Sequence, residues 1–277
     1  MRFEGFTIRR CLQDASLPRL ELQLLLAKVV VQRREWLIAH DDHVLTPEQS
    51  EQFDLLYARR LAGEPMAYLL GQREFMGLVF EVSPAVLIPR PETELLVQTV
   101  LERVVQIRQP RILDLGTGSG AIAVSLAHAH PEATVWATDI SRAAMALAKC
   151  NAQRHGVAIE CHVGNWFEAL PVATLPFDVI VSNPPYIHPD DEHLRQGDLR
   201  FEPRQALTEG LDGLSVYRTL AELAEQHLVS GGWLCVEHGF DQSRDINAIF
   251  KDAGLQTVET LSDLSGHPRV TAGSYNT

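Results

Sequence analysis

Segments that favour strands and segments that favour helices alternate beyond Pro110, and this alternation constrains the fold more than any other feature of the chain. The expected strands cover residues 111–115, 134–139, 159–163, 177–182, 232–237, 255–261 and 269–272. The expected helices cover residues 121–129, 142–155, 217–227 and 246–253. The connection at 262–268 is too short for a helix, which implies an antiparallel final pair. The pattern predicts a doubly wound, mostly parallel, seven-stranded α/β sheet.

The first 72 residues lack the period-two alternation of strands and are predicted to form a small helical domain. An apolar run at 20–31 suits a packed helix, and Thr46 followed by Pro47 predicts the start of another helix. Residues 74–82 are β-prone around a glycine, which is typical of a hairpin. We therefore divide the chain into a helical domain at 1–72, a β-hairpin linker at 73–88 and a larger domain at 89–277.

The net charge of −12 is concentrated in the second part of the chain, since residues 1–72 carry −1 and residues 73–277 carry −11. An acidic catalytic region would repel a phosphate backbone, which argues against a nucleic-acid substrate. The N-terminus has no apolar stretch typical of a signal peptide, and no window approaches the length of a transmembrane helix. Four cysteines without C-x-x-C spacing predict reduced, buried thiols. We expect a cytoplasmic protein with no membrane partner.

A glycine loop lies where the first of these strands passes into the first helix, at residues 113–121. Glycines there permit a tight turn and let the backbone approach a ligand at a helix N-terminus. The second strand ends in Asp139, whose carboxylate is placed to accept hydrogen bonds from both hydroxyls of a ribose. The pattern predicts a nucleotide-type ligand with the candidate contacts Gly116, Thr117, Gly118, Ser119, Gly120 and Asp139.

The segment Asn183-Pro184-Pro185-Tyr186 follows a buried strand directly and is the most informative in the chain. Its prolines offer no N–H, so the loop presents carbonyl oxygens and one side-chain amide. The Asn183 Oδ1 and the Pro184 carbonyl are suited to accept the two N–H bonds of a planar amide or amino group. The second proline holds that carbonyl in an extended conformation, and Tyr186 is placed to stack on the planar group. The loop predicts a site that orients a weakly nucleophilic nitrogen, with orientation as the main catalytic effect.

Five segments together resemble the release-factor glutamine methyltransferase family (the HemK type), and the likeness covers essentially the whole chain. They are Gly71–Phe75, Leu87–Glu94, Asp114–Gly120, Asn183–Tyr186 and Arg200–Pro203. The Asn-Pro-Pro-Tyr motif alone is shared with amino-group DNA methyltransferases. The Ile-Pro-Arg-Pro-Glu-Thr-Glu sequence is far more specific to this family.

This resemblance implies a Class I methyltransferase fold, S-adenosylmethionine as cofactor and N5-methylation of the glutamine in the Gly-Gly-Gln motif of class-1 peptide-chain release factors. It places the cofactor on residues 116–120, Asp139, Trp166 and Asn183, and the target glutamine on residues 183–186. Core packing is the alternative interpretation of Trp166. The family often has Asp where this chain has Asn165, which leaves an adenine contact at that position open. We expect the helical domain to dock the protein substrate.

Other classes of protein share parts of this pattern. An adenine-N6 or cytosine-N4 nucleic-acid methyltransferase would need a basic target-reading region, which the acidic residues 73–277 do not supply. A dinucleotide oxidoreductase accounts for the glycine loop but leaves Asn-Pro-Pro-Tyr unexplained. A non-catalytic cofactor-binding module is opposed by the presence of both loops. The close histidine pair His128 and His130 lacks a matching Cys, Asp or Glu cluster, so we expect no metal.

Overall fold

The computed structural model describes residues 2–208 and 212–276, which divide into two compact units after Gln72. Each unit has its own hydrophobic core. Among the described residues, no helix is both long and apolar enough to cross a bilayer.

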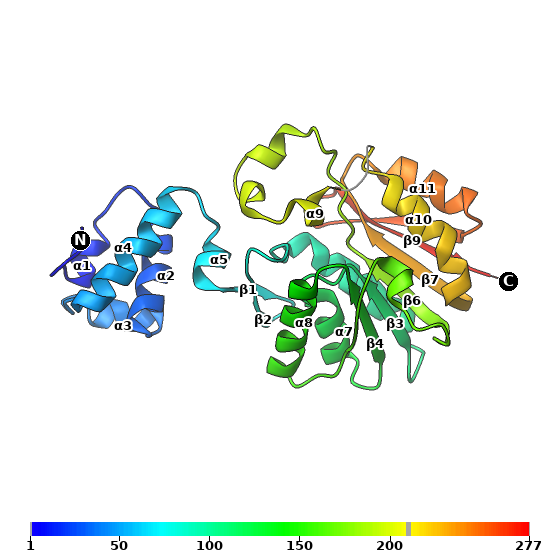
Figure 1. The fold of residues 1–277 in the computed structure, drawn as a ribbon, viewed down its shortest axis with the longest axis horizontal. Coiled ribbons are helices and arrows are strands. Elements are labelled where there is room, and N and C mark those ends of the chain that lie inside the picture. Colours follow the sequence, from blue (N-terminus) through cyan, green and yellow to red (C-terminus); the bar gives the residue numbers. More distant parts are fainter. Residues whose placement is uncertain (1, 209–211, 277) are drawn as a thin grey trace. The chain divides into compact units, whose positions relative to one another are not determined.

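The first unit is helical, as predicted (Figure 1). Its helices are α1 (Ile8–Cys11), α2 (Arg19–Val30), α3 (Arg34–Ala39), α4 (Pro47–Leu61) and α5 (Met66–Leu70). Thr46 caps α4, since its side chain accepts a hydrogen bond from the Gln49 N–H while the Gln49 side chain accepts one from the Thr46 N–H. The apolar run predicted α2 and the cap predicted α4. The other three helices are too short for a periodic pattern to reveal them.

A β-hairpin follows the last of these helices. It consists of β1 (Gln72–Phe75) and β2 (Leu78–Glu81), which form a two-stranded sheet. Met76 and Gly77 connect the strands with φ angles of 52° and 76°. Positive φ at both residues of a two-residue connection suits the twist of a hairpin. The predicted hairpin is present, and its role as a linker stays a prediction.

The second unit contains the predicted doubly wound sheet. Among the described residues it has seven strands in the order β5-β4-β3-β6-β7-β9-β8 (Figure 1). They are β3 (Arg111–Leu115), β4 (Thr134–Asp139), β5 (Glu160–Val163), β6 (Phe177–Ser182), β7 (Leu228–Glu237), β8 (Gln256–Ser262) and β9 (Pro268–Tyr275). Strand β9 pairs antiparallel with both β7 and β8, and the other pairings are parallel. The predicted fold class is confirmed.

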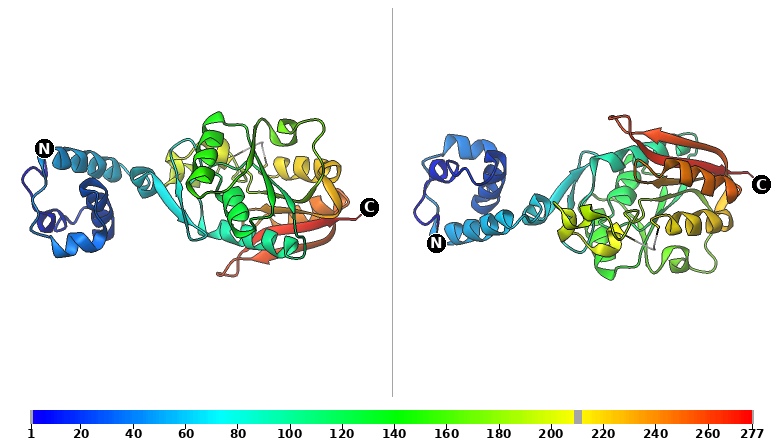
Figure 2. Two further views of the ribbon diagram at one scale, coloured as in Figure 1. Left: turned by 90° about the horizontal axis from the view of Figure 1, so that it is seen from below. Right: turned by 90° about the horizontal axis from the view of Figure 1, so that it is seen from above.

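Helices cover both faces of this sheet (Figure 2). One face carries α6 (Glu94–Val104), α7 (Ala121–Ala129) and α8 (Arg142–Arg154). The opposite face carries α10 (Ser215–Ala224) and α11 (Ser243–Asp252). Ile112 belongs to the first core cluster and its neighbour Leu113 to the second, because successive side chains of a strand point to opposite faces. Both faces are therefore buried, which explains the nearly continuous apolar sequence of the central strands.

Short helical turns connect the main elements. They are η1 (Pro91–Thr93), η2 (Trp166–Ala169), η3 (Glu192–Arg195), η4 (Leu199–Phe201), α9 (Arg204–Leu207) and η5 (Glu225–His227). The sequence pattern did not predict the turns between β6 and α10.

The prediction for the cysteines was partly wrong. All four thiols are free, but only Cys11 and Cys235 are buried, whereas Cys161 is half-buried and Cys150 is exposed. Cys150 lies at an outward position of the amphipathic helix α8, a placement that cysteine spacing does not reveal.

Candidate active site

Four neighbouring strands of the sheet end in register at one edge. The residues that pair across them are Thr138, Leu115, Ser182 and Val236. The residues that come next along the chain are Asp139, Gly116, Asn183 and Glu237. Ligands of open α/β sheets bind outside the carboxyl ends of the strands. The register thus brings the predicted site residues Asp139, Gly116 and Asn183 to one edge. It also places Glu237 there, a residue that the sequence analysis did not select.

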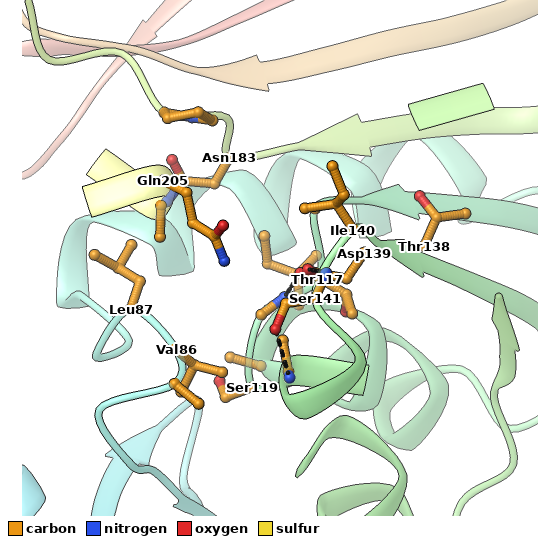
Figure 3. Close-up of a pocket in the computed structure, with 18 of the residues that line it drawn as sticks. Val86, Leu87, Thr117, Ser119, Thr138, Asp139, Ile140, Ser141, Asn183 and Gln205 are labelled. Atoms are coloured by element: carbon orange, nitrogen blue, oxygen red, sulfur yellow. Dashed lines mark hydrogen bonds between the residues drawn. The ribbon is translucent and has the colours of Figure 1, made fainter. Parts of the chain in front are cut away.

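A cavity of about 300 Å³ lies at this edge of the sheet (Figure 3). The predicted site residues that line it are Gly116, Thr117, Gly118, Ser119, Asp139, Trp166, Asn183 and Pro185. Residues that the sequence analysis did not assign to the site also line it, among them Val86, Leu87, Thr93, Ile140, Ser141 and Gln205. The Gln205 side chain extends from α9 into the space between Asn183 and Thr117 (Figure 3). The volume is at the lower end of the range for small-molecule sites.

A smaller cavity, of about 50 Å³, lies beside Asn183. Pro184 and Tyr186 line this cavity together with Arg90 and Glu237. Asn183 lines both cavities, as do Leu87, Arg90 and Ala206, and so lies where the two adjoin. The predicted catalytic residues are thus together, with the smaller space on one side and the larger space on the other.

The glycines of the loop have two different functions in the fold. Gly116 has a φ of 76°, and a Cβ on it would come 3.3 Å from the indole of Trp166. Gly120 has a φ of 81° at the N-cap of α7, and a Cβ there would come 3.0 Å from the Cβ of Ala148 in α8. Gly116 therefore lets the Trp166 indole lie close to the backbone of the loop. Gly120 instead allows two helices to pack closely, and it is not among the residues that line the cavity.

Asp139 ends β4 with its carboxylate bound to the glycine loop and to the start of α8. Its Oδ2 accepts a hydrogen bond from the Gly118 N–H at 2.9 Å, and its Oδ1 accepts one from the Ser141 N–H at 2.8 Å. Burial raises the pKa of Asp139, and these two hydrogen bonds act in the opposite direction. Each carboxylate oxygen accepts more than one hydrogen bond, so both retain capacity for hydroxyl donors in the cavity.

Trp166 has a φ of 42°, in the left-handed region that is unusual for a bulky side chain. Its indole lies against Gly116 on the side of the cavity. The ring also packs on the hydrophobic cluster that contains the buried residues of α10. The two interpretations offered by the sequence are therefore compatible, because one ring forms part of the cavity wall and part of the core.

The side-chain amide of Asn183 is oriented by a buried hydroxyl. Its Nδ2 donates a hydrogen bond to Thr93 Oγ1 at 3.2 Å. With the nitrogen directed at Thr93, the Oδ1 remains as the acceptor that a ligand can use. Burial raises the pKa of Tyr186, and the charge of Glu237 adds to that rise, so the phenol stays neutral. The loop is also anchored from α11, since the Gln242 side chain donates to the Tyr186 carbonyl at 3.1 Å.

Two of the segments that carry the family resemblance are joined by one buried carboxylate. Glu202 is 6% exposed, accepts a hydrogen bond from the Ile88 N–H at 3.0 Å and forms an ion pair with Arg90. Burial raises the pKa of Glu202, and the charge of Arg90 opposes that rise. The contact holds the 85–90 segment close to the chain just before α9, and residues of this segment and of α9 line the larger cavity.

The larger cavity suits the parts of S-adenosylmethionine. Asp139 offers a carboxylate for vicinal ribose hydroxyls, and the loop at 116–119 presents backbone close to the cavity with little side chain. Trp166 and Ile140, whose side chain remains 63% exposed, supply apolar surface for a planar base. In residues 2–208 and 212–276 no group of three or more His, Cys, Asp or Glu side chains is placed to hold a metal ion.

Two family models match the chain, the Methyltransferase small domain at residues 91–200 and the PrmC N-terminal domain at residues 7–71. The release factor glutamine methyltransferase of Bordetella pertussis is 52% identical over 96% of this chain and 98% of its own length. The protein of the same name from Neisseria gonorrhoeae is 48% identical over 94% of this chain and 95% of its own length.

Solved structures agree on the fold. A 16S rRNA methyltransferase of T. thermophilus, solved in complex with AdoMet and guanosine, superimposes with a TM-score of 0.56 at 20% identity. The match covers 74% of this chain and 50% of that one, and at this identity it shows the fold alone. The two relatives, in contrast, match this chain over nearly its full length and at high identity. The chain therefore belongs to the release factor glutamine methyltransferase family and is an S-adenosylmethionine-dependent methyltransferase.

Proposed function

We propose that this enzyme methylates the N5 amide nitrogen of the glutamine in the Gly-Gly-Gln motif of class-1 release factors. The observation that carries the proposal is the position of Asn183, which lines both cavities with its Nδ2 directed at Thr93. In this proposal Asn183 orients the target amide where the larger and the smaller cavity adjoin. The names of the relatives support the protein substrate.

S-adenosylmethionine, when bound, supplies an electrophilic methyl group on a sulfonium. The residues of the loop position the nucleophile, because an amide nitrogen is weakly nucleophilic and too weakly acidic to be deprotonated first. In our proposal the Asn183 Oδ1 and the Pro184 carbonyl accept the two amide N–H bonds. Tyr186, neutral and half-buried, packs on the planar amide. Correct orientation of this kind is worth several kcal/mol of the activation barrier, on the order of 7 or more in favourable cases.

For the cofactor we propose contacts from residues 116–119, Asp139 and Trp166, with Asn183 at the reacting end. The lining of the larger cavity supports this assignment. Gly120 would act indirectly, by letting α7 approach α8 so that the loop keeps its conformation.

We further propose that the helical unit docks the release factor. Of its three arginine pairs, two are engaged within the unit, since Arg9 binds Asp41 and both Arg59 and Arg60 bind glutamates. The pair Arg33 and Arg34 is exposed and forms no ion pair among the described residues, although Arg34 donates a hydrogen bond to Gln23 Oε1 at 3.1 Å. Exposed Val31 and Ile38 lie near it in the chain. These four residues, here named the α3 surface, combine positive charge with apolar side chains of 85% and 73% exposure.

Incubation with labelled S-adenosylmethionine tests the substrate class directly. Release factor, DNA and RNA are offered separately, and we expect label only on the release factor, at the glutamine of its Gly-Gly-Gln motif. Mass spectrometry of the labelled peptide locates the methyl group. Label on DNA or RNA but not on the release factor would instead support the amino-group nucleic-acid methyltransferase.

A charge-reversal variant tests docking. We expect Arg33→Glu with Arg34→Glu to raise the KM for release factor several-fold at unchanged kcat, since docking acts before chemistry. The matched control reverses two exposed basic residues of the other unit, Arg108→Glu with Lys149→Glu. Equal kcat/KM for wild type and the α3-surface variant would reject this docking role.

A further inference from the structure

Glu237 is a buried carboxylate at the reacting end of the site. It is the last residue of β7, is 2% exposed and lines the small cavity together with Asn183, Pro184 and Tyr186. The cavity volume of about 50 Å³ exceeds the space that a single water molecule requires. A planar amide group inserted there would therefore come close to this carboxylate.

The contacts of Glu237 do not account for its burial. Its Oε1 accepts a hydrogen bond from the Tyr186 hydroxyl at 3.5 Å, the limit of such a bond, and its Oε2 has no partner of good geometry among the described residues. Glu237 forms no ion pair among the described residues. The neighbouring cation Arg269 pairs instead with Asp263, at 3.2 Å. Buried carboxylates kept only for stability are normally paired and hydrogen-bonded. An unpaired one in a cavity is a candidate for chemistry.

The proposed reaction creates a need for such a group. When the methyl group leaves sulfur, the S–CH₃ bond breaks, an N–CH₃ bond forms and the positive charge moves to the amide nitrogen. That nitrogen then carries two protons and one methyl group in addition to its bond to the carbonyl carbon. The neutral product forms when one N–H bond breaks and the proton is transferred to an acceptor. Neither Asn183 Oδ1 nor the Pro184 carbonyl is basic enough to keep it.

We propose that Glu237 is that acceptor and that its negative charge stabilises the cationic nitrogen as the N–CH₃ bond forms. This inference rests on the proposed function, because it takes an amide nitrogen as the methyl acceptor. The proton forms an O–H bond on the Glu237 carboxyl and returns to solvent after the product has left. A fixed charge in a site without bulk water acts strongly on charge that develops nearby.

The charge state of Glu237 should control the reaction. Burial raises the pKa of Glu237 to about 7, while the nearby polar groups of Thr93 and Asn183 and the charge of Arg269 lower it. The charge of Glu92 raises it further. The titratable and charged groups around this carboxyl are Arg269 on β9, Glu92 in η1, Arg90, Tyr186 and Tyr217 on α10. The reaction requires the anion, so activity should rise as the pH increases through about 7.

The test is the pH dependence of single-turnover methyl transfer to release factor, measured with saturating enzyme and cofactor between about pH 5.5 and 9. Wild type should show a rate that rises to a plateau with an inflection near 7. Glu237→Gln should lower the plateau rate about 10²-fold or more and abolish the inflection. Glu237→Asp, which restores a carboxylate, should recover part of the rate and an inflection. The dissociation constant for S-adenosylmethionine should not change in either variant.

Two further variants identify the titrating group even if the Glu237 variants fold poorly. Glu92→Gln removes an exposed carboxylate that raises the pKa of Glu237, so the inflection should move to lower pH. Arg269→Gln removes a cation that lowers this pKa, so the inflection should move to higher pH. Both should keep the plateau rate of wild type.

The inference and the proposed function fail in different ways. If wild type places no label on the release factor, the proposed function is wrong. If wild type methylates the release factor but Glu237→Gln has the same rate and pH profile, only the role of Glu237 is wrong. Inflections that stay fixed in both Glu92→Gln and Arg269→Gln would also overturn it.

Discussion

Two buried carboxylates at the carboxyl edge of the sheet, Asp114 near the end of β3 and Glu237 at the end of β7, have different surroundings. Asp114 Oδ2 accepts a hydrogen bond from the Thr117 hydroxyl at 2.6 Å and another from the Ala123 N–H at 3.2 Å. Burial raises the pKa of Asp114 to about 7, as it does for Glu237. Asp114 lines neither cavity, whereas Glu237 lines the smaller one and has a single long side-chain hydrogen bond.

This difference separates a group that maintains a loop from a group that is available to a substrate. Asp114 joins the glycine loop to the first turn of α7, and its hydrogen bonds compensate part of the cost of burial. Glu237 is compensated less, because its one hydrogen bond of accepted geometry is the long contact from Tyr186, although the polar groups of Thr93 and Asn183 lie near it. Its carboxylate lines a space that an amide could enter. A raised pKa alone therefore does not identify a reacting group. The hydrogen-bond partners of the carboxyl and the open space beside it show whether it is available to a substrate.

The largest effect is expected at the boundary between the two cavities. Asn183→Ala removes the acceptor that orients the attacking nitrogen, so methyl transfer should fall about 10²–10³-fold, as when one preorganised hydrogen-bonding group is lost. Single-turnover rates measure the loss, while circular dichroism and S-adenosylmethionine binding confirm the fold. Asn183→Asp, which keeps an acceptor, should retain residual activity. Near-normal turnover in the Ala variant would rule out the amide-orientation mechanism.

The next effect concerns the stability of the fold and tests the role of Asp114. The raised pKa of Asp114 means that the folded state binds a proton more tightly than the unfolded state. Its contribution to stability is therefore present at low pH and is lost as the pH rises to about 7. For a shift from 3.8 to about 7 the loss between pH 5 and pH 8 is about 2–3 kcal/mol.

Asp114→Asn should remove this component, so the free energy of unfolding should change less between pH 5 and pH 8 than in wild type. Urea unfolding at the two pH values measures it. The amide keeps an oxygen acceptor for Thr117 and Ala123. An identical pH dependence in variant and wild type would show that Asp114 does not titrate in this range.

At the cofactor end the expected effect is on binding. Asp139→Ala removes a carboxylate that would receive ribose hydroxyls, so S-adenosylmethionine should bind about 1.5–3 kcal/mol more weakly. Asp139→Asn, which retains one acceptor oxygen, should lie between wild type and the Ala variant. Calorimetry gives the dissociation constants, and unchanged affinity in the Ala variant would exclude Asp139 from the site.

The smallest effect is expected from the hydroxyl behind Asn183. Thr93→Val removes the acceptor of the Asn183 Nδ2, so the amide is no longer held in one orientation and kcat should fall about fivefold, equivalent to about 1 kcal/mol. Thr99→Val is the matched control, because that buried hydroxyl binds the Leu95 carbonyl within α6 at 2.8 Å. A similar kcat for both variants would mean that Thr93 does not position Asn183.

The sequence predicted those features that depend on neighbouring residues. Thr46 followed by Pro47 predicted the start of α4, and the interval 262–268 leaves room only for an antiparallel return between β8 and β9. Glycine spacing and the strand end at Asp139 located the larger cavity. Short helices such as α9 carry too few residues for a period to appear, so Gln205 was missed although its side chain enters that cavity.

By itself the sequence determined the fold class, the two loops and the family, because hydrophobic period, turn chemistry and motif order are properties of the chain. Only the tertiary structure decided which distant side chains meet. Strand register places Glu237 beside Asn183, although 54 positions separate them, and Glu202 reaches Ile88 and Arg90 across more than 110. Such contacts depend on how strands align and how loops pack over their ends, which no local pattern encodes. In the sequence Glu237 is an ordinary acidic residue at the end of an expected strand. Its burial beside the smaller cavity, which Asn183 also lines, gives it its distinct chemistry.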